Sequence, residues 1–217
     1  MRFWRSWQWW AGLAAVAAFV GASILWFDRP VARWAAARPE AWQDLGKWLS
    51  ELGQAHWVLL PGVVGAIWCR WWRPDRERLA RFQAYCWAVA LPSLAELLLK
   101  GLCGRARPKL LFEKGIYGFF PGTGWHYRYA GFPSGHNVTV TAAMTALWVL
   151  HPPGRPLYLA GALAMMAARV LAKGHFPADV VAGSFIGLTL ALLVLRWRAA
   201  AVPAASRPPP AAAEGGA

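Results

Sequence analysis

Charged residues are scarce in this chain of 217 residues, because Asp, Glu, Lys and Arg together make up only 15% of it. A soluble domain carries about 25% charged residues. The deficit, together with 58% hydrophobic residues, indicates a membrane protein with no room for a separate soluble domain. Cysteine is also scarce, and Cys69, Cys86 and Cys103 form no CxxC pair. We therefore expect them to pack in the core or against lipid.

Acidic residues are few as well, with 10 Asp and Glu against 23 Lys and Arg, so the net charge is +13. Such a balance can indicate a nucleic-acid-binding protein. Here the basic residues are divided among the loops between apolar runs instead of lining one face. We therefore expect a phosphate-bearing lipid and the bilayer as partners, and no nucleic acid.

Long apolar runs predict an all-α, polytopic membrane helix bundle with about six transmembrane helices. The predicted spans are residues 9–27, 55–72, 82–99, 135–150, 157–172 and 180–195. The alternative for the first run is a cleaved signal peptide, whose apolar core would be roughly 7–15 residues long. The first run is longer than that and is followed directly by Asp28-Arg29-Pro30, which favours a retained span.

Two further segments complete the predicted organisation. Residues 31–52 carry mixed charges and place Leu45, Trp48, Leu49 and Leu52 at helical spacing, which predicts an amphipathic helix on the membrane surface. Residues 199–217 are rich in Pro and Ala, and this composition predicts a disordered tail. One membrane domain is thus expected over residues 1–198.

Lys and Arg in the loops predict the orientation of the spans. Groups of Arg precede the first span, separate the second from the third and follow the sixth. With alternating spans, all three groups lie on one side, which predicts cytoplasmic N- and C-termini in a bacterial inner membrane. Residues 100–128 carry six cations against the single Glu113 and lie on the opposite side. We attribute these cations to a ligand.

Three polar clusters flank the later spans. Residues 100–108 read KGLCGRARP, residues 133–136 read PSGH and residues 169–179 read RVLAKGHFPAD. Six spans place the end of the third, the start of the fourth, the end of the fifth and the start of the sixth at one membrane face. The clusters therefore predict a single site at that face, formed by Lys100, Arg107, Ser134, Gly135, His136, Arg169, His175 and Asp179.

The residue types in these clusters suit a phosphate group. Ser134 is a good helix N-cap, and the free N–H groups after it would bind an anion, with Gly135 allowing close approach. Asp179 can orient the His175 imidazole, whose free nitrogen can attack phosphorus. The three cations Lys100, Arg107 and Arg169 would balance the phosphate charge. The structural alternatives are a simple helix cap and an interhelical His–Asp hydrogen bond. Glu96, one turn before Lys100, is expected to pair with that lysine or with another cation.

At these residues the chain resembles the type 2 phosphatidic acid phosphatase family of membrane lipid phosphatases. The family signature is K-x6-R-P, P-S-G-H and S-R-x5-H-x3-D, and the first two motifs are complete at residues 100–108 and 133–136. In the third, Ala168 stands where the family has serine, which puts one phosphate-contacting hydroxyl in doubt. The resemblance covers roughly residues 50–195.

The resemblance implies a role for each motif residue. His175 would be the nucleophile that forms a phosphohistidine, Asp179 its partner, and His136 the acid that protonates the leaving oxygen. Lys100, Arg107, Ser134, Gly135 and Arg169 would hold the phosphate, and no metal or other cofactor would be required. The residues alone leave open which of the two histidines attacks.

The expected function is removal of phosphate from a membrane lipid at the periplasmic face. A lipid-to-lipid phosphotransferase that uses the same histidine, and a non-catalytic binder or transporter of anionic lipid, remain alternatives. Vanadate haloperoxidases resemble the same family, but they are soluble. Phosphatidate, phosphatidylglycerophosphate, polyprenyl diphosphate and lipid A phosphates all fit as substrates, and the oligomeric state is open. The aromatic loop 115–128 is expected to line the entrance.

Overall fold

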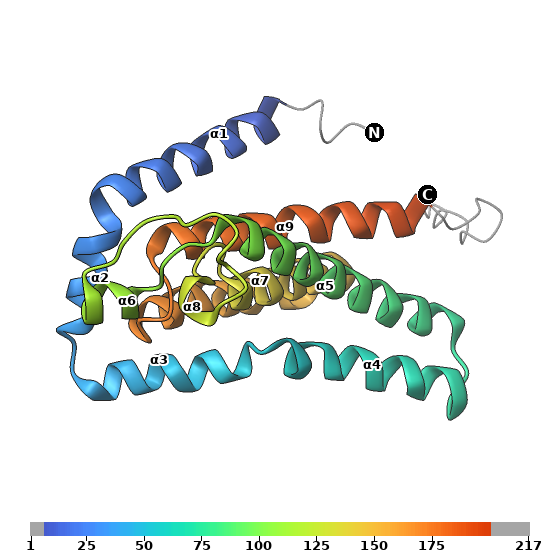
Figure 1. The fold of residues 1–217 in the computed structure, drawn as a ribbon. Coiled ribbons are helices and arrows are strands. Elements are labelled where there is room, and N and C mark those ends of the chain that lie inside the picture. The colour runs from blue at the N-terminus through green and yellow to red at the C-terminus, as the bar shows by residue number, and fades with distance from the viewer. Residues whose placement is uncertain (1–6, 201–217) are drawn as a thin grey trace, which may run out of the picture.

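The computed structural model describes residues 7–200, and these residues fold into a helical bundle (Figure 1). The α-helices are α1 (Trp7–Ala22), α2 (Asp28–Ala36), α3 (Glu40–Leu52), α4 (Ala55–Trp71), α5 (Arg76–Cys103), α6 (Pro108–Lys114), α7 (Gly135–Leu150), α8 (Arg155–Leu171) and α9 (Pro177–Ala200). A π-helical turn, Ser23–Phe27, joins α1 to α2 without a break. The tail predicted from residue 201 onward lies outside the described residues.

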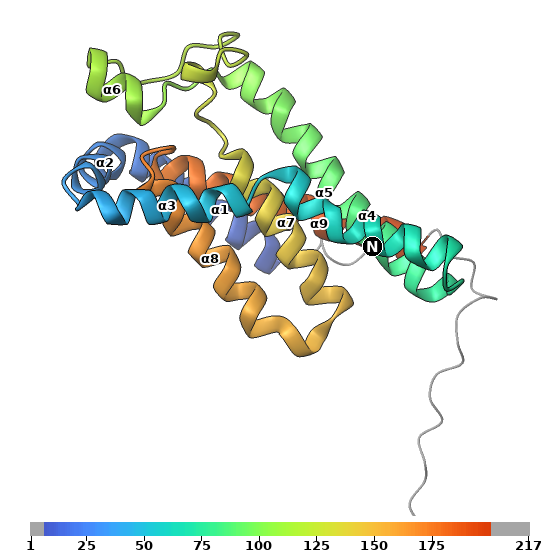
Figure 2. The same ribbon diagram turned by 90° about the horizontal axis from the view of Figure 1, so that it is seen from below.

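Helices α5, α7 and α9 pack together at the centre of the bundle. Helix α1 lies along α9, α4 lies along α5, and α8 packs on α7, with α3 crossing the outer side of α8. Figures 1 and 2 show the polar connection between α5 and α7, which includes α6, gathered at the end of the bundle where α9 begins. The predicted all-α membrane bundle is confirmed.

The six predicted spans correspond in order to α1, α4, α5, α7, α8 and α9. Four helical stretches are long and apolar enough to cross a membrane, namely residues 7–36, 40–71, 76–103 and 177–200. Helices α7 and α8 have only 16 and 17 residues. They are short because polar motif residues occupy their ends at the site. The number of membrane crossings therefore stays a prediction.

The segment predicted as one amphipathic helix, residues 31–52, is in fact two helices. Helix α2 ends at Ala36 and α3 starts at Glu40, with Pro39 between them. The break follows from Pro39, because a proline disfavours the helical conformation of the residue before it. Helix α3 is amphipathic, but its apolar face points away from the bundle. It exposes large apolar residues such as Trp42 and Trp48 and buries the small residues Gly46 and Ser50.

Glycines allow close backbone approach between the packed helices. A Cβ atom at Gly187 would lie 2.4 Å from the Val138 carbonyl oxygen, and one at Gly183 would lie 2.6 Å from the Ser134 carbonyl oxygen. Small residues favour this kind of packing between membrane helices. The approach of α9 to α7 brings their N-termini together, and the backbone N–H of Ser134 donates a 3.0 Å hydrogen bond to the Asp179 carbonyl. Two of the predicted clusters thereby meet.

We predict that Gly46→Ala destabilises the protein, whereas Gly12→Ala does not. A Cβ atom at Gly46 would lie 2.8 Å from Ala172 N and 2.9 Å from Ala168 O, both rigid backbone atoms of the α8 end. A Cβ atom at Gly12 on α1 meets nothing within 4 Å. Overpacking of this kind costs about 1–3 kcal/mol. Thermal unfolding in detergent should show a lower midpoint for Gly46→Ala only, and equal midpoints would contradict the packing of α3 on α8.

Candidate active site

A cavity of about 530 Å³ opens between the α3–α4 turn, α5, α7 and the end of α8. Five of the eight predicted site residues line it: Lys100, Arg107, Gly135, His136 and Arg169. These residues come from three separate stretches of the chain. The clusters that the sequence placed at one face therefore do form one pocket. The other three predicted residues, Ser134, His175 and Asp179, are buried behind its wall.

The first turn of α7 leaves backbone donors free at the cavity. Ser134 is the N-cap residue, and the first helical hydrogen bond is made by Val138 N–H to the Ser134 carbonyl. The N–H groups of residues 135–137 therefore have no partner within the helix. The Ser134 hydroxyl does not cap them as expected, because it donates to Asn137 Oδ1 at 2.9 Å. The N-cap position was predicted correctly, and the side-chain contact was not.

Two arginines present unpaired donors in the pocket. Arg107 and Arg169 are each 8% exposed, and the Nε atom of each is buried without a hydrogen-bond partner among the described residues. The Arg107 guanidinium also lies 4.0 Å from the centre of the Tyr127 ring. Burial lowers the pKa of Arg107, because burial disfavours the charged form. Buried cations with free donors are well suited to an anionic ligand.

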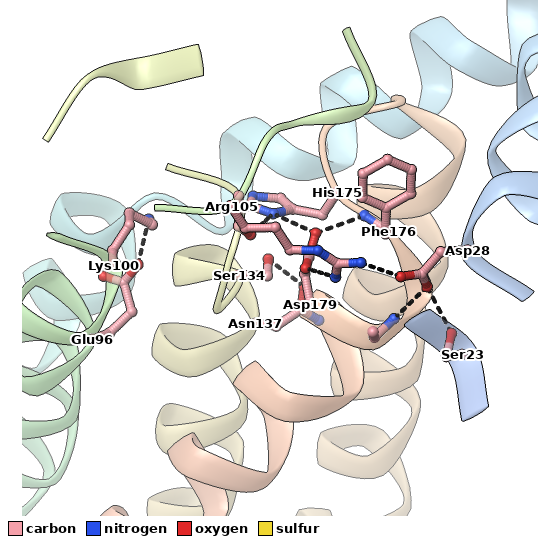
Figure 3. Close-up of polar contacts among 12 residues, drawn as sticks. Ser23, Asp28, Glu96, Lys100, Arg105, Ser134, Asn137, His175, Phe176 and Asp179 are labelled. Atoms are coloured by element: carbon pink, nitrogen blue, oxygen red, sulfur yellow. Dashed lines mark hydrogen bonds and ion pairs between the residues drawn. The ribbon is translucent and has the colours of Figure 1, made fainter. Parts of the chain in front are cut away.

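Lys100 forms an ion pair with Glu96 one turn earlier on α5, as expected from their spacing (Figure 3). This pair lies against the start of α7. A Cβ atom at Gly135 would lie 2.8 Å from Glu96 Oε1 and 3.1 Å from Lys100 Nζ. Glycine is therefore needed at position 135 so that the helix start and the lysine can approach the same anion.

The His175 imidazole has a defined tautomer. It is 2% exposed, and its Nδ1 atom lies 2.7 Å from the Gly131 carbonyl oxygen. A carbonyl oxygen only accepts, so Nδ1 must carry the proton and donate it. The lone pair is then on Nε2. Burial, followed by the cations Arg107, Arg169 and Lys100, lowers the pKa of His175 well below its usual value. His175 is therefore neutral, as a nucleophile must be.

Arg169 also shapes the loop that carries His175. Its carbonyl accepts hydrogen bonds from the N–H groups of Gly174 at 3.1 Å and His175 at 3.3 Å. A Cβ atom at Gly174 would lie 2.5 Å from Arg169 Nη2. The guanidinium thus packs directly on the backbone next to the imidazole, and this fixes the two groups close to each other.

Asp179 does not hold His175 by a direct hydrogen bond, which corrects the expectation from the sequence. The Asp179 Oδ2 atom lies 3.6 Å from His175 Nδ1 and accepts a 2.8 Å hydrogen bond from Phe176 N–H. The Gly131 carbonyl, which is closer, orients the ring instead. The carboxylate is still near enough to stabilise a positive charge on the imidazole.

Two buried charged residues, Arg105 and Asp28, were not predicted from the sequence. Arg105 Nη1 forms an ion pair with Asp179 Oδ1, and Arg105 Nη2 forms one with Asp28 Oδ2. Arg105 could have been noticed because it is a second arginine inside the first motif, residues 100–108. Asp28 could have been found by parity, because the end of the first predicted span lies at the same face as the site.

Ala168, the departure from the family pattern, is 1% exposed and does not line the cavity. Its backbone carbonyl faces Gly46 of α3, where a Cβ atom would lie only 2.9 Å away. The methyl group at position 168 thus belongs to the packing between α8 and its neighbours. The side chains that line the cavity come from other residues.

The aromatic loop 115–128 divides its side chains between two places. Among its aromatic residues, Tyr127 lines the cavity, beside Arg107. Tyr117 instead donates a 2.7 Å hydrogen bond to the Ile24 carbonyl, and burial raises its pKa to about 12, so it stays a neutral donor. Trp125 packs on Gly101 of α5. Of the aromatic side chains in this loop, only Tyr127 is therefore placed to line the entrance of the cavity.

The fold and the site define a class, an integral membrane helix bundle whose polar end encloses an anion pocket of cations and imidazoles. A family model described as the PAP2 superfamily matches residues 82–203. Two lipid A 1-phosphatases are similar in sequence. The one from Rhizobium etli is 33% identical and the one from Rhizobium johnstonii 31%, each over 86% of this chain and 83% and 79% of the relative.

A solved structure shares the fold. It is described as the first transmembrane PAP2-type phosphatidylglycerolphosphate phosphatase from Bacillus subtilis, and the two superpose with a TM-score of 0.57. The alignment covers 88% of this chain and 93% of the other, at 17% identity. This chain belongs to the PAP2 superfamily, as its motifs predicted. Membership confirms the expected enzyme class, a membrane phosphatase for lipid phosphates.

We predict that Gly135→Ala weakens anion binding, whereas Gly21→Ala does not. The new methyl group would push on the Glu96–Lys100 pair, and a Cβ atom at Gly21 on α1 meets nothing within 4 Å. The expected loss of affinity for orthovanadate, used as a phosphate analogue, is about tenfold, or about 1.4 kcal/mol. Inhibition of phosphate release by vanadate measures it. Equal inhibition constants in the two variants would refute this role of Gly135.

Proposed function

We propose that this phosphatase transfers the phosphate of a membrane lipid to His175 and then to water. The observation that carries the proposal is the state of His175, a neutral imidazole with its proton on Nδ1 and its lone pair on Nε2. Lys100, Arg107 and Arg169 are the cations that act on this imidazole. A nucleophile held next to cations can approach a dianionic phosphate, which would otherwise repel it.

In the first step, His175 Nε2 attacks phosphorus and the bond from phosphorus to the lipid oxygen breaks. We assign His136, which lines the cavity, as the acid that gives a proton to the departing oxygen. The imidazole becomes positively charged as the N–P bond forms. The Asp179 carboxylate, 3.6 Å from Nδ1, stabilises that charge. The lipid alcohol then leaves.

In the second step, water attacks the phosphohistidine. His136 has lost its proton in the first step and accepts one from this water. The N–P bond breaks, inorganic phosphate leaves and His175 returns to its neutral form. The arginine donors and the N–H groups at the start of α7 are placed to hold the three phosphate oxygens in both steps. Proposed roles thus exist for seven of the eight predicted site residues. Ser134 is instead assigned a supporting role, because it begins α7 and its backbone N–H donates to the Asp179 carbonyl.

We place the site at the periplasmic face of a bacterial inner membrane. The α4–α5 turn and the helix ends that flank it lie at the end of the bundle away from the site (Figure 1). This region carries Arg70, Arg73, Arg76, Arg78 and Arg81. Arginine-rich loops stay in the cytoplasm. The opposite end would then face the periplasm, and Lys100, Arg107 and Arg169 at that end line the pocket.

For the substrate we propose a phosphate attached to the sugar of a lipid A-type glycolipid. The relatives with 33% and 31% identity are both lipid A 1-phosphatases. The cavity wall formed by the α3–α4 turn adds support, because Glu51, Gln54 and His56 line it. Such side chains can form hydrogen bonds with the hydroxyl and amide groups of a sugar. An acyl-glycerol phosphate offers fewer groups of this kind.

We predict that His175→Ala abolishes both phosphate release and covalent labelling. Protein in detergent would be mixed with lipid A carrying a labelled 1-phosphate and quenched in alkali, in which phosphohistidine is stable. The wild-type protein should release phosphate and carry an alkali-stable, acid-labile label. His151→Ala is the matched control, since this exposed histidine lies at the far end of α7 beside Tyr158. Label on the His175→Ala protein would rule out this nucleophile.

We predict that a panel of lipids will separate the possible substrates. The panel contains lipid A 1-phosphate, phosphatidate, phosphatidylglycerophosphate and a polyprenyl diphosphate, scored by inorganic phosphate. Glu51→Ala should reduce the rate on lipid A more than the rate on phosphatidate, because only the former presents a sugar to that wall. Equal losses would remove the sugar assignment. Transfer of label to a second lipid, without free phosphate, would instead identify a phosphotransferase.

A further inference from the structure

Among residues 7–200, the most deeply buried cation lies outside the phosphate pocket. Arg105 is 0% exposed, and Figure 3 shows its guanidinium between two carboxylates. Nη1 contacts Asp179 and Nη2 contacts Asp28. The rings of Phe176 and Phe119 lie 5.0 Å from its central carbon atom. The described side chains therefore leave Arg105 no direct role at the phosphate, because it is enclosed by aromatic rings and carboxylates.

Asp28 comes from a part of the chain that the PAP2 family model does not match, since the match begins at residue 82. Its side chain is nonetheless 0% exposed and fully bonded. Oδ1 accepts hydrogen bonds from the Ser23 hydroxyl at 2.6 Å and from Ala178 N–H at 3.1 Å, in the first turn of α9. Oδ2 binds Arg105 and lies 3.2 Å from the Tyr117 hydroxyl.

The π-helical turn Ser23–Phe27 is what presents this carboxylate to α9. A π turn shifts the register of a helix and is frequent at functional sites. Here the Ser23 hydroxyl and the Ile24 carbonyl both point to the same cluster, where they bond Asp28 and Tyr117. Three other segments of the chain, which contain Asp28, Tyr117 and Asp179, thus converge on the Arg105 guanidinium, and both carboxylates are fully buried.

The contacts divide the two oxygens of Asp179 between two tasks. Oδ1 pairs with Arg105, while Oδ2 accepts from Phe176 N–H and faces His175 Nδ1 at 3.6 Å. Arg105 carries one positive charge and is shared by two carboxylates. The cluster therefore keeps one net negative charge next to the imidazole. Without Asp28, the arginine would neutralise Asp179 completely.

We propose that Asp28 is a positioning residue for the phosphatase reaction, which binds Arg105 so that the arginine is shared between two carboxylates and holds Asp179 aligned beside His175. The proposal rests on the function proposed above, since it acts through the phosphohistidine. Asp28 touches neither the pocket nor the substrate. Its effect is on the imidazole, which becomes positive only when phosphorus is bonded to it. Loss of Asp28 should therefore slow phosphoryl transfer and leave substrate binding nearly unchanged.

The test is Asp28→Asn in the full-length protein, assayed with the panel lipid that the wild-type protein hydrolyses fastest. Asparagine keeps the shape of the side chain and can still accept from Ser23 and Ala178 N–H, but it removes the charge. We expect kcat to fall about tenfold, which corresponds to about 1.4 kcal/mol, with KM changed less than about threefold. The rate of labelling of His175 should fall by the same factor as kcat.

Two further variants separate charge from architecture. Ser50→Ala removes another buried hydrogen bond, 2.7 Å from the Ser50 hydroxyl to the Gly46 carbonyl within α3, and should leave kcat unchanged. Asp28→Glu restores the charge and should recover most of the lost rate. Where Asp28→Asn gives no folded protein, Arg105→Lys takes its place, because an ammonium group keeps the charge but cannot bind both carboxylates side by side. The same loss of kcat is expected.

An unchanged kcat in Asp28→Asn, or a loss confined to KM, would overturn the proposal and leave Asp28 as an anchor for α1 and α2. A loss that Asp28→Glu does not recover would also overturn it. These results differ from failure of the proposed function. In that case the wild-type protein itself would release no phosphate from any panel lipid and carry no label on His175.

Discussion

The organisation of this protein depends on a concentration of positive charge that the chain does not neutralise. Lys100, Arg107 and Arg169 meet near one buried imidazole, and two acids, Glu51 and Glu96, line the same cavity, with Glu96 paired to Lys100. Burying such charges at a membrane is unfavourable unless a ligand compensates. Unpaired Nε atoms on both arginines show where the compensation is missing. A phosphate group supplies the charge and the acceptor atoms that this arrangement lacks.

The same cations explain why His175 is suited to attack phosphorus. Positive neighbours and burial keep the imidazole neutral, and the Gly131 carbonyl fixes which nitrogen carries the proton. The opposite charge needed after attack is held behind the ring by Asp179, which shares Arg105 with Asp28. Charge is thus arranged in layers, positive in the pocket and negative behind the imidazole. This order favours a reaction in which negative phosphate arrives and positive imidazole forms.

Much of the architecture could be predicted from local sequence. Hydropathy located the helices α1, α4, α5, α7, α8 and α9, and for α7 the predicted residues 135–150 coincide with the observed helix. The prediction of one amphipathic helix over residues 31–52 was wrong, because Pro39 separates this segment into two helices. The motif residues were found because each has a characteristic type and spacing. The hydrogen bond expected between His175 and Asp179 was wrong, since a backbone carbonyl, which no residue type reveals, lies closer.

The sequence by itself determined the class of the protein, its helices, its phosphate-binding motifs and, by parity, the face on which they meet. These features depend on residue type, spacing and the thickness of a bilayer, which act along the chain. Only the tertiary structure decided how the charges are paired. Asp28 and Arg105 are separated by 77 positions, and they meet because the π turn, the glycine-mediated packing of α9 on α7 and the loop after α5 converge. Such a contact depends on the packing of several segments at once, so no local pattern records it.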